Sequence, residues 1–416
     1  MNAPLRTPTP TPLSRDPSGA FRSVWVLLSI GLLYVSFGVC FGLLEFGVPP
    51  IMMTHGVDLA SMGWVIALYI PFGLTFLWAP LIDSRALPWL GYRIGWIVAS
   101  QCVSSALLVL VAFGSDLPAT GLFVLGLGTC FAVATMDLAL DALAVDIIGP
   151  NYRALAAGLK VGALALGGLI GGGVLVGMFD RLTWTGTFLL AAGLPILTML
   201  PVLTLIRADK PRSNAITRPS VLVTLRRPGI VRQITLLSLI TSATISLVYF
   251  QRPILVQMGV PLTRIGWELG TLAPLLNTAA AVMIAPLLSL ASPVKSLAFL
   301  VAASAIAAAG MVWGVSHGSV DSVMSWALAQ GMASSALSVI IYTLILKWSA
   351  RGQSATDYAV LCGSSRLLTT LILMAVPPAL PYLSWGMFYV LCVVALTVLA
   401  WLIRHEVRSL DDRLPT

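Results

Sequence analysis

The sequence predicts an all-α polytopic membrane protein with twelve transmembrane helices in two six-helix halves. Only 10% of the 416 residues are charged and 58% are hydrophobic, whereas a soluble domain carries about 25% charged residues. The mean hydropathy is +0.95 over the whole chain, and apolar runs long enough to cross a bilayer recur from end to end. Basic residues gather in every second loop, a pattern typical of membrane topology.

The first half begins after a polar, proline- and threonine-rich stretch at residues 1–22, which predicts a disordered cytoplasmic tail. The apolar run that starts at Val24 is too long for a signal peptide and predicts an uncleaved first helix. The fifth run, KVGALALGGLIGGGVLVG, is rich in glycine, so we expect it to pack closely against other helices. Within residues 23–206 the expected spans are 24–46, 60–82, 94–114, 119–145, 154–178 and 184–206.

The second half follows a basic, proline-containing stretch at 207–230, which predicts a cytoplasmic linker. A weak echo relates the halves, because a Gly-Trp pair stands eight residues before a proline at Gly63 and again at Gly266. Each run is long enough for a helix to cross the bilayer, and helices satisfy their own backbone hydrogen bonds there. Residues 231–405 hold the expected spans 231–253, 265–290, 295–315, 321–347, 355–380 and 384–404, and 406–416 form a cytoplasmic tail.

Orientation follows from the distribution of lysine and arginine. With the N-terminus inside, nineteen basic residues fall in inner segments and three in outer ones, namely Arg181, Arg252 and Arg264. This asymmetry places both termini in the cytoplasm. It also explains the net charge of +8 as a membrane signal, so we expect the lipid bilayer, and no nucleic acid, as a partner.

Three aspartates lie in or beside the fourth apolar run. Asp137 and Asp141 are four residues apart and share one helix face. An unpaired carboxylate buried there costs several kcal/mol, so each needs a partner, water or a bound proton. One hypothesis is that either residue takes and releases a proton or orients a cation; the alternative is a structural ion pair with Arg153 or Lys160. Asp146 lies near the cytoplasmic end and suits a gate.

Two cations are also predicted inside spans. Lys160 either neutralises Asp137 or Asp141, or attracts an anionic substrate, and Arg366 either grips such a substrate or belongs to a cytoplasmic gate. Glu45, near the outer end of the first span, is either a rim carboxylate or an entry group for protons or cations. Three tryptophans within spans are candidates to face a central cavity and bind substrate: Trp64, Trp267 and Trp326.

Enzyme chemistry is not expected. The sequence shows no Ser/His/Asp constellation, no cofactor motif and no GxxxxGK[ST] loop for ATP, and its five cysteines have no metal-site or disulfide spacing. Uphill movement of a solute would therefore need an ion gradient. We predict no enzyme activity, no cofactor and no metal site.

Three motifs resemble one family. The first is FLWAPLIDSRALPWLGYRIGWIVASQ at 76–101, the second the spacing Asp137, Asp141, Ala142 and Asp146, and the third SATDYAVLCGSSR at 354–366. Together they are similar to the muropeptide permease and acetyl-CoA transporter branch of the major facilitator superfamily. The resemblance implies two related halves around a central cavity, a monomer in a bacterial inner membrane, and a cytoplasmic gate at Asp83 and Arg93. Asp146 and Arg153, near the same end, are expected to belong to that gate or to a loop salt bridge.

The resemblance is less specific for cargo. Muropeptide permeases generally have extra helices, whereas compact twelve-helix members include single-subunit siderophore permeases. We therefore expect a proton-driven importer of a ferric siderophore similar to pyochelin or rhizobactin, with protons as the coupling ion. The alternatives are a permease for a peptidoglycan fragment or another small anionic metabolite, export instead of import, and a non-transporting membrane assembly factor.

Overall fold

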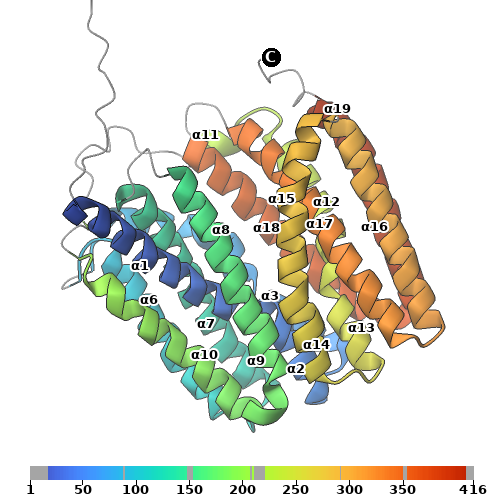
Figure 1. Ribbon diagram of the computed structural model, residues 1–416, viewed down its shortest axis with the longest axis horizontal. Helices are drawn as coiled ribbons and strands as arrows, with labels where there is room; N and C mark the ends of the chain where they lie inside the picture. The colour runs from blue at the N-terminus through green and yellow to red at the C-terminus, as the bar shows by residue number, and fades with distance from the viewer. Residues whose placement is uncertain are drawn as a thin grey trace, which may run out of the picture.

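The computed structural model describes residues 17–87, 90–147, 153–206, 209, 221–290, 292–349 and 354–408, and every regular element within them is a helix (Figure 1). The predicted all-α class is therefore confirmed. Eleven helices in the described residues are long and apolar enough to cross a membrane. The remaining predicted span, 265–290, is helical too, although it is not among those eleven.

The first half contains six helical passes. Three of them are interrupted by short changes of helix type, where the hydrogen-bond ladder slips by one residue or tightens. In chain order the elements are α1 (Pro17–Gly42), η1 (Leu43–Gly47), α2 (Val48–Thr54), η2 (Leu59–Ser61), α3 (Met62–Ala67), α4 (Ile70–Leu74), η3 (Thr75–Leu77), α5 (Ala79–Ser84), α6 (Ile94–Ala112), α7 (Ala119–Ile147), α8 (Arg153–Leu169), η5 (Ile170–Val174), α9 (Leu175–Gly177) and α10 (Phe179–Leu203).

The second half repeats this plan after a short helix in the linker. Its elements are α11 (Val221–Leu225), α12 (Ile230–Tyr249), α13 (Gln251–Gln257), α14 (Leu262–Ile265), η6 (Gly266–Leu272), α15 (Ala273–Leu290), α16 (Pro293–Ser316), α17 (Val320–Ser349), α18 (Ser354–Ala379), η7 (Leu380–Tyr382) and α19 (Trp385–Arg408).

Two boundaries differ from the sequence prediction. The first helix begins at Pro17, so the end of the predicted tail is helical. The seventh pass continues through α13 to Gln257, and Arg252 on α13 is only 6% exposed. The sequence places Arg252 in an outer segment, at the end of the expected span 231–253; in the structure the helix continues past Arg252 and buries its side chain.

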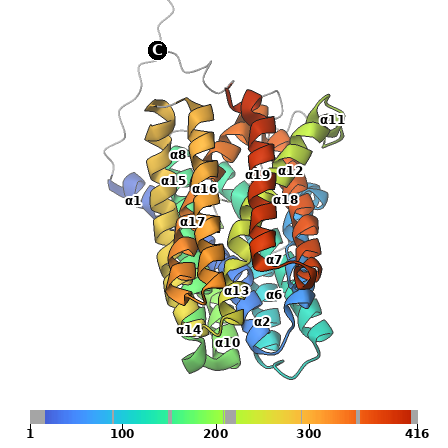
Figure 2. The same cartoon turned by 90° about the vertical axis from the view of Figure 1, so that its right-hand side faces the viewer.

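The two ends of the bundle are distinct. The linker helix α11 and the end of α19 lie at one end, which we call the linker end, whereas α14 and α2 lie at the opposite end (Figures 1 and 2). Trp25 near the start of α1 donates a hydrogen bond to Thr204 after α10 at 2.9 Å. The beginning of the first pass and the end of the sixth therefore both lie at the linker end.

The halves meet along two pairs of helices. α18 packs along α3 and α4, and η5 packs against η6. Glycine permits both contacts, because a Cβ built on Gly63 would lie 2.8 Å from the carbonyl oxygen of Met374, and one on Gly266 would lie 2.2 Å from the backbone nitrogen of Gly177. Gly63 and Gly266 are the glycines of the repeated Gly-Trp pair, so this repeat marks equivalent contacts between the halves.

The helical stretches η1, η5 and η6 are π-helical and pack together in the order η1, η5, η6. A Cβ on Gly270 would lie 2.2 Å from the carbonyl oxygen of Gly172 and 2.3 Å from the Cα of Gly173. Only hydrogen fits in that space. The expected role of the glycine-rich fifth run in close packing is therefore confirmed.

Candidate functional site

The first cluster of charges joins α1, α7 and α8. Lys160 Nζ lies 2.5 and 2.7 Å from the two carboxylate oxygens of Asp141 and 3.8 Å from Asp137 Oδ1. The Tyr34 hydroxyl donates to Asp141 Oδ1 at 2.7 Å, and its ring lies 5.1 Å from the ammonium group. The side chains of Lys160 and Asp141 remain 31% and 45% exposed, so this cluster can be reached from outside the packed core.

Within this cluster the two aspartates have different surroundings. Asp141 is held by Lys160 and Tyr34. Asp137 Oδ1 is buried and has no hydrogen-bond partner among the described residues. The arrangement therefore combines an ion pair with a second carboxylate that is available to a proton or a moving cation.

Arg366 on α18 connects this cluster to the other half. It interacts electrostatically with Asp137 and Lys160, and also with Glu45 on η1. Because α18 belongs to the second half, a shift between the halves would change the balance of charge around both acidic sites.

A second site lies between the halves beside Glu45. A cavity of about 160 Å³ is bounded by η1, α12, α15 and α17. Seven of its eleven lining residues carry a hydroxyl, amide or carboxylate group, and apolar atoms complete the wall: Glu45, Phe46, Thr244, Ile245, Val248, Tyr249, Asn277, Gly331, Ser334, Ser335 and Ser338. Residues from both halves therefore form its wall.

Arg252 supplies positive charge next to this cavity. Its guanidinium lies 4.3 Å from the ring centroid of Phe46 and donates to the carbonyl oxygen of Leu269 at 3.0 Å. It also interacts electrostatically with Glu45. Arg252 was not among the predicted site residues, because it lies at the outer end of its expected span, where a long basic side chain usually reaches the membrane surface.

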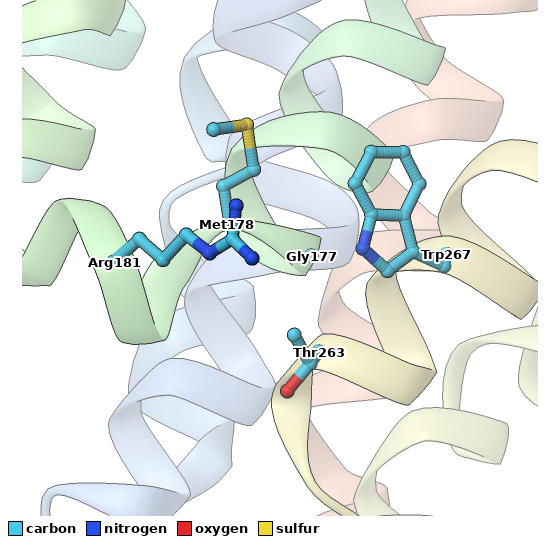
Figure 3. Close-up of a pocket in the computed structure, with 5 residues that line it drawn as sticks. All are labelled: Gly177, Met178, Arg181, Thr263 and Trp267. Carbon is cyan, nitrogen blue, oxygen red and sulfur yellow. The ribbon is translucent and has the colours of Figure 1, made fainter.

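A third group of residues lies at the opposite end. A cavity of about 240 Å³ is lined by Gly177, Met178, Arg181, Thr263 and Trp267, and the indole of Trp267 faces the Gly177 backbone (Figure 3). A Cβ on Gly177 would lie 3.1 Å from that indole. Thr263 donates across the half boundary to Asp180 Oδ2 at 2.7 Å. These contacts hold the halves together at the opposite end.

Arg264 strengthens the same end within the second half. It donates to Asp321 and, at 2.6 Å, to Glu268 Oε1. The hydrogen bonds that the Arg264 guanidinium donates to Asp321 and then to Glu268 raise its pKa above the ordinary value. The group therefore stays a cation and ties α14 to the start of α17.

Arg93 lies in a buried network at the linker end. Its guanidinium donates to the carbonyl oxygen of Ile82 at 3.0 Å, and its backbone N–H donates to Asp209 Oδ2 at 2.7 Å. The same oxygen accepts from the N–H of Ile94 at 2.8 Å and so caps the start of α6. Gly91 has φ of +89°, and a Cβ there would lie 2.8 Å from Asp209 Oδ2, which requires glycine.

A buried ion pair anchors the linker to α18. Arg227 Nη1 lies 2.7 Å from Asp357 Oδ2, and the Thr224 hydroxyl donates to Asp357 Oδ1 at 2.7 Å. Arg227 also donates to the carbonyl oxygen of Trp348 at 3.0 Å. Sequence reasoning did not single out Asp357, although it lies inside the third quoted motif.

A model of the Major Facilitator Superfamily matches residues 30–315. The chain belongs to this superfamily. Anhydromuropeptide permease of Escherichia coli strain K12 is 31% identical over 149 residues, which are 35% of this chain and 30% of that permease. Putative transporter AmpG 4 of Rickettsia felis is 28% identical over 145 residues, or 33% of this chain and 34% of the relative. The match thus spans about a third of the length of these curated relatives.

Solved structures support the superfamily fold. A bacterial homolog of the human lysosomal transporter Spinster, inward-facing and unoccupied, has a TM-score of 0.68 at 16% identity and covers 97% of this chain and 100% of its own. A mutant of the nucleoside transporter NupG has a TM-score of 0.69 at 14% identity, covering 92% and 99%. A bacterial homologue of the iron transporter ferroportin, inward-facing, has a TM-score of 0.62 at 17% identity, covering 94% and 99%.

The superfamily assignment agrees with the resemblance found in the motifs, and the chain has a multi-pass membrane transporter fold. The similarity to an anhydromuropeptide permease fits the expected branch. The comparisons give no support to the siderophore permeases within it. The comparisons therefore favour the peptidoglycan fragment, which was named as the alternative cargo, over the ferric siderophore first expected from the sequence.

The residues predicted for the site of this major facilitator protein fall in several places. Asp137, Asp141, Lys160 and Arg366 gather around one cluster, and Glu45 lines the cavity between the halves. Trp267 lines the opposite-end cavity. Trp64 is 68% exposed with its ring 5.9 Å from that of Phe123, and Trp326 packs over Gly310 on α16.

Of the predicted gate of this major facilitator protein, only Arg93 has a described side chain. Asp83 on α5, Asp146 on α7 and Arg153 on α8 have described helical backbones, but their side chains lie outside the description. In the part of the chain whose side chains are described, no group of three His, Cys, Asp or Glu residues could hold a metal ion.

Proposed function

We propose that this chain is a secondary transporter that carries a small anionic, hydrogen-bonding metabolite, a peptidoglycan fragment, across a bacterial inner membrane with protons as the coupling ion. The single observation that carries the proposal is the Lys160–Asp141 ion pair with Asp137 beside it. A scaffold has little reason to bear the cost of charges at this depth. The partial similarity to an anhydromuropeptide permease supports the choice of cargo.

The geometry suggests how coupling works. Contacts through Gly270, Gly266 and Trp267 close the opposite end, whereas the Lys160–Asp141 cluster keeps exposed surface. A proton on Asp137 removes one negative charge from that cluster. The positive charges of Lys160 and Arg366 are then less fully neutralised and attract an anionic cargo. Loss of the proton reverses this effect.

The orientation and assembly belong to the same proposal. The linker end faces the cytoplasm with both termini, because basic residues concentrate in the segments assigned to that side. The chain acts as a monomer by analogy with its superfamily. Export instead of import needs no change of structure, since the gradient sets the direction of alternating access.

A ferric siderophore is the second candidate cargo, because the motif comparison within the branch first favoured it. Its aromatic, largely apolar surface suits the cavity beside Glu45 poorly, since hydroxyl, amide and carboxylate groups line much of that cavity. A peptidoglycan fragment offers hydroxyl and amide groups that match this lining better.

The test is uptake into proteoliposomes that contain the full chain, with an imposed pH gradient and an uncoupler arm. The labelled cargoes are an anhydromuropeptide and ferric pyochelin. We expect gradient-dependent uptake of the anhydromuropeptide, and its loss in Asp137→Asn protein inserted at normal levels. Uptake of ferric pyochelin instead would establish the second candidate. Failure to move either cargo would overturn the proposed function and favour the assembly-factor alternative.

A further inference from the structure

Several buried polar atoms around Glu45 have no hydrogen-bond partner among the described residues. They are Tyr69 Oη, Tyr249 Oη, Arg252 Nε and Asn277 Oδ1. An unpaired buried polar atom destabilises a fold, and native structures keep few of them. Tyr69 and Tyr249 are 6.5 Å apart between ring centroids. Unpaired groups from both halves concentrated in one place indicate a site built for a ligand.

The cavity wall offers donors, from the Tyr249 hydroxyl and the Asn277 amide, and also several hydrogen-bond acceptors. The hydroxyl hydrogens of Thr244, Ser335 and Ser338 are committed to the carbonyl oxygens of Ile240, Asn277 and Ser334, at 2.8, 2.9 and 2.9 Å. Their oxygens keep free lone pairs.

Two further acceptors complete this wall. Asn277 Oδ1 lacks a donor, and the Glu45 carboxylate lines the same space. A ligand that fits this wall must therefore bring hydrogen-bond donors.

Charge around Glu45 supports the same chemistry. Arg252 and Arg366 both interact electrostatically with Glu45, so positive charge lies near this carboxyl group. Arg252 lies behind the Phe46 ring and is engaged with the Leu269 carbonyl oxygen. The Glu45 carboxylate therefore remains available to accept hydrogen bonds from a ligand.

We propose that the cavity bounded by Glu45, Tyr249 and Asn277 is a subsite that reads the hydroxyl and amide N–H donors of the cargo. Arg366 interacts electrostatically with both Glu45 and the Asp137–Lys160 cluster, so it links this subsite to the cluster that meets the anionic group. With about 160 Å³, the cavity is smaller than the roughly 300–1,000 Å³ of a complete ligand pocket, so it holds one sugar-sized part of a larger molecule. Only the identity of that molecule rests on the proposed function.

The test measures binding separately from transport. The probes are methyl N-acetylglucosaminide, which is neutral and rich in donors, and its per-O-methylated analogue, which lacks hydroxyl donors. The full-length protein in detergent is titrated with each, and affinity is read from the ligand-dependent shift in the unfolding temperature. We expect stabilisation by the first probe and little by the second. Equal binding of both would overturn the subsite.

Variants then identify the protein groups that accept hydrogen bonds from the ligand. Glu45→Gln and Asn277→Leu each weaken binding by about tenfold, the value of a lost charge-assisted or buried hydrogen bond. Glu45→Gln is nearly isosteric, so a loss of binding in this variant is not an effect of packing. Asp116→Asn, in an exposed loop, leaves affinity unchanged. Unchanged affinity in both Glu45→Gln and Asn277→Leu would overturn the proposal.

Uptake by the same proteins separates this proposal from the function. If the wild type binds the sugar but does not transport an anhydromuropeptide, the proposed subsite is supported and the proposed cargo is refuted. If the wild type transports the anhydromuropeptide and the KM is unchanged in Glu45→Gln and Asn277→Leu, the proposed cargo is supported and the proposed subsite is refuted. Absence of both binding and transport overturns both.

Discussion

Lys160 grips both carboxylate oxygens of Asp141, at 2.5 and 2.7 Å, and stands 3.8 Å from the nearest oxygen of Asp137. The two aspartates lie one helical turn apart on α7, and the single lysine binds Asp141 more closely than Asp137. Asp141 is held in an ion pair, whereas Asp137 remains available to a proton or a moving cation. Substitutions at the two positions should therefore have different consequences.

We predict that Asp141→Asn mainly lowers stability. The substitution removes the strong partner of Lys160, and the half-exposed pair places the cost between that of surface and buried pairs, at about 1–2 kcal/mol. The unfolding temperature of the purified protein measures this. Asp58→Asn, at an exposed position on the opposite end, is the control. An equal loss in both variants would contradict the prediction.

We predict that Asp137→Asn leaves the fold intact and removes proton coupling. Its carboxylate has one oxygen without a hydrogen-bond partner among the described residues, and the amide keeps its size without binding a proton reversibly. Gradient-driven uptake should therefore fall to background while exchange of internal for external cargo continues. Both are measured in the same proteoliposomes. Retained gradient-driven uptake would show that Asp137 is a structural residue.

We predict that Arg227→Met destabilises the protein by about 3–5 kcal/mol, because it leaves the buried Asp357 carboxylate without its charge partner. The double variant Arg227→Met with Asp357→Leu should recover much of the loss, since neither charge then remains. Arg226→Met, at the adjacent exposed residue, is the matched control. Chemical unfolding in detergent measures all three, and a double variant as unstable as the single one would refute the ion-pair explanation.

We predict that Gly270→Ala separates the halves at the opposite end. Its Cβ would collide with the backbone of Gly172 and Gly173, and such overpacking costs about 1–3 kcal/mol, enough to shift a two-state equilibrium by roughly tenfold. A reporter cysteine in Arg181→Cys, which lines the cavity there, should react faster with an impermeant maleimide.

Gly162→Ala is the matched control for Gly270→Ala, because a Cβ at Gly162 meets nothing within 4 Å. It should leave the labelling rate unchanged. If Gly270→Ala also leaves the rate unchanged, the glycine contact does not control closure of the opposite end.

We predict that Asp209→Ala destabilises the start of α6. Asp209 accepts the backbone N–H groups of Arg93 and Ile94, and loss of such a cap costs about 0.5–2 kcal/mol. Hydrogen exchange of the first turn of α6 should accelerate, whereas the first turn of α16, which Ser292 caps, should stay protected. Unchanged exchange in α6 would contradict the capping role.

Much of the fold could be predicted because the bilayer imposes a simple rule. Apolar runs of sufficient length must be helical there, and the positions of the runs therefore give the passes and the boundary between the halves. The rule does not show that the seventh helix continues to Gln257 and buries Arg252. It also gives no sign that π-helical stretches interrupt the first, fifth and eighth passes.

The site was predictable only in part. The spacing of Asp137 and Asp141 indicates one helix face, and Lys160 was named as a possible partner for either. The choice of Asp141 depends on the crossing of α7 and α8. Asp209 and Asp357 gave no signal as isolated residues, since their partners are 116 and 130 positions away in the chain. The coupling and binding roles of these side chains stay predictions until the variants are measured.

The sequence by itself determined the membrane class, the helical passes, the division into halves and the residue types that must bear charge inside them. These properties depend on local hydropathy, helical period and loop charge, which are all written along the chain. Only the tertiary structure decided that Glu45, Tyr249 and Asn277 share a cavity and that Gly270 meets Gly173. Such contacts depend on how whole helices cross, and crossing is set by the combined packing of many distant side chains.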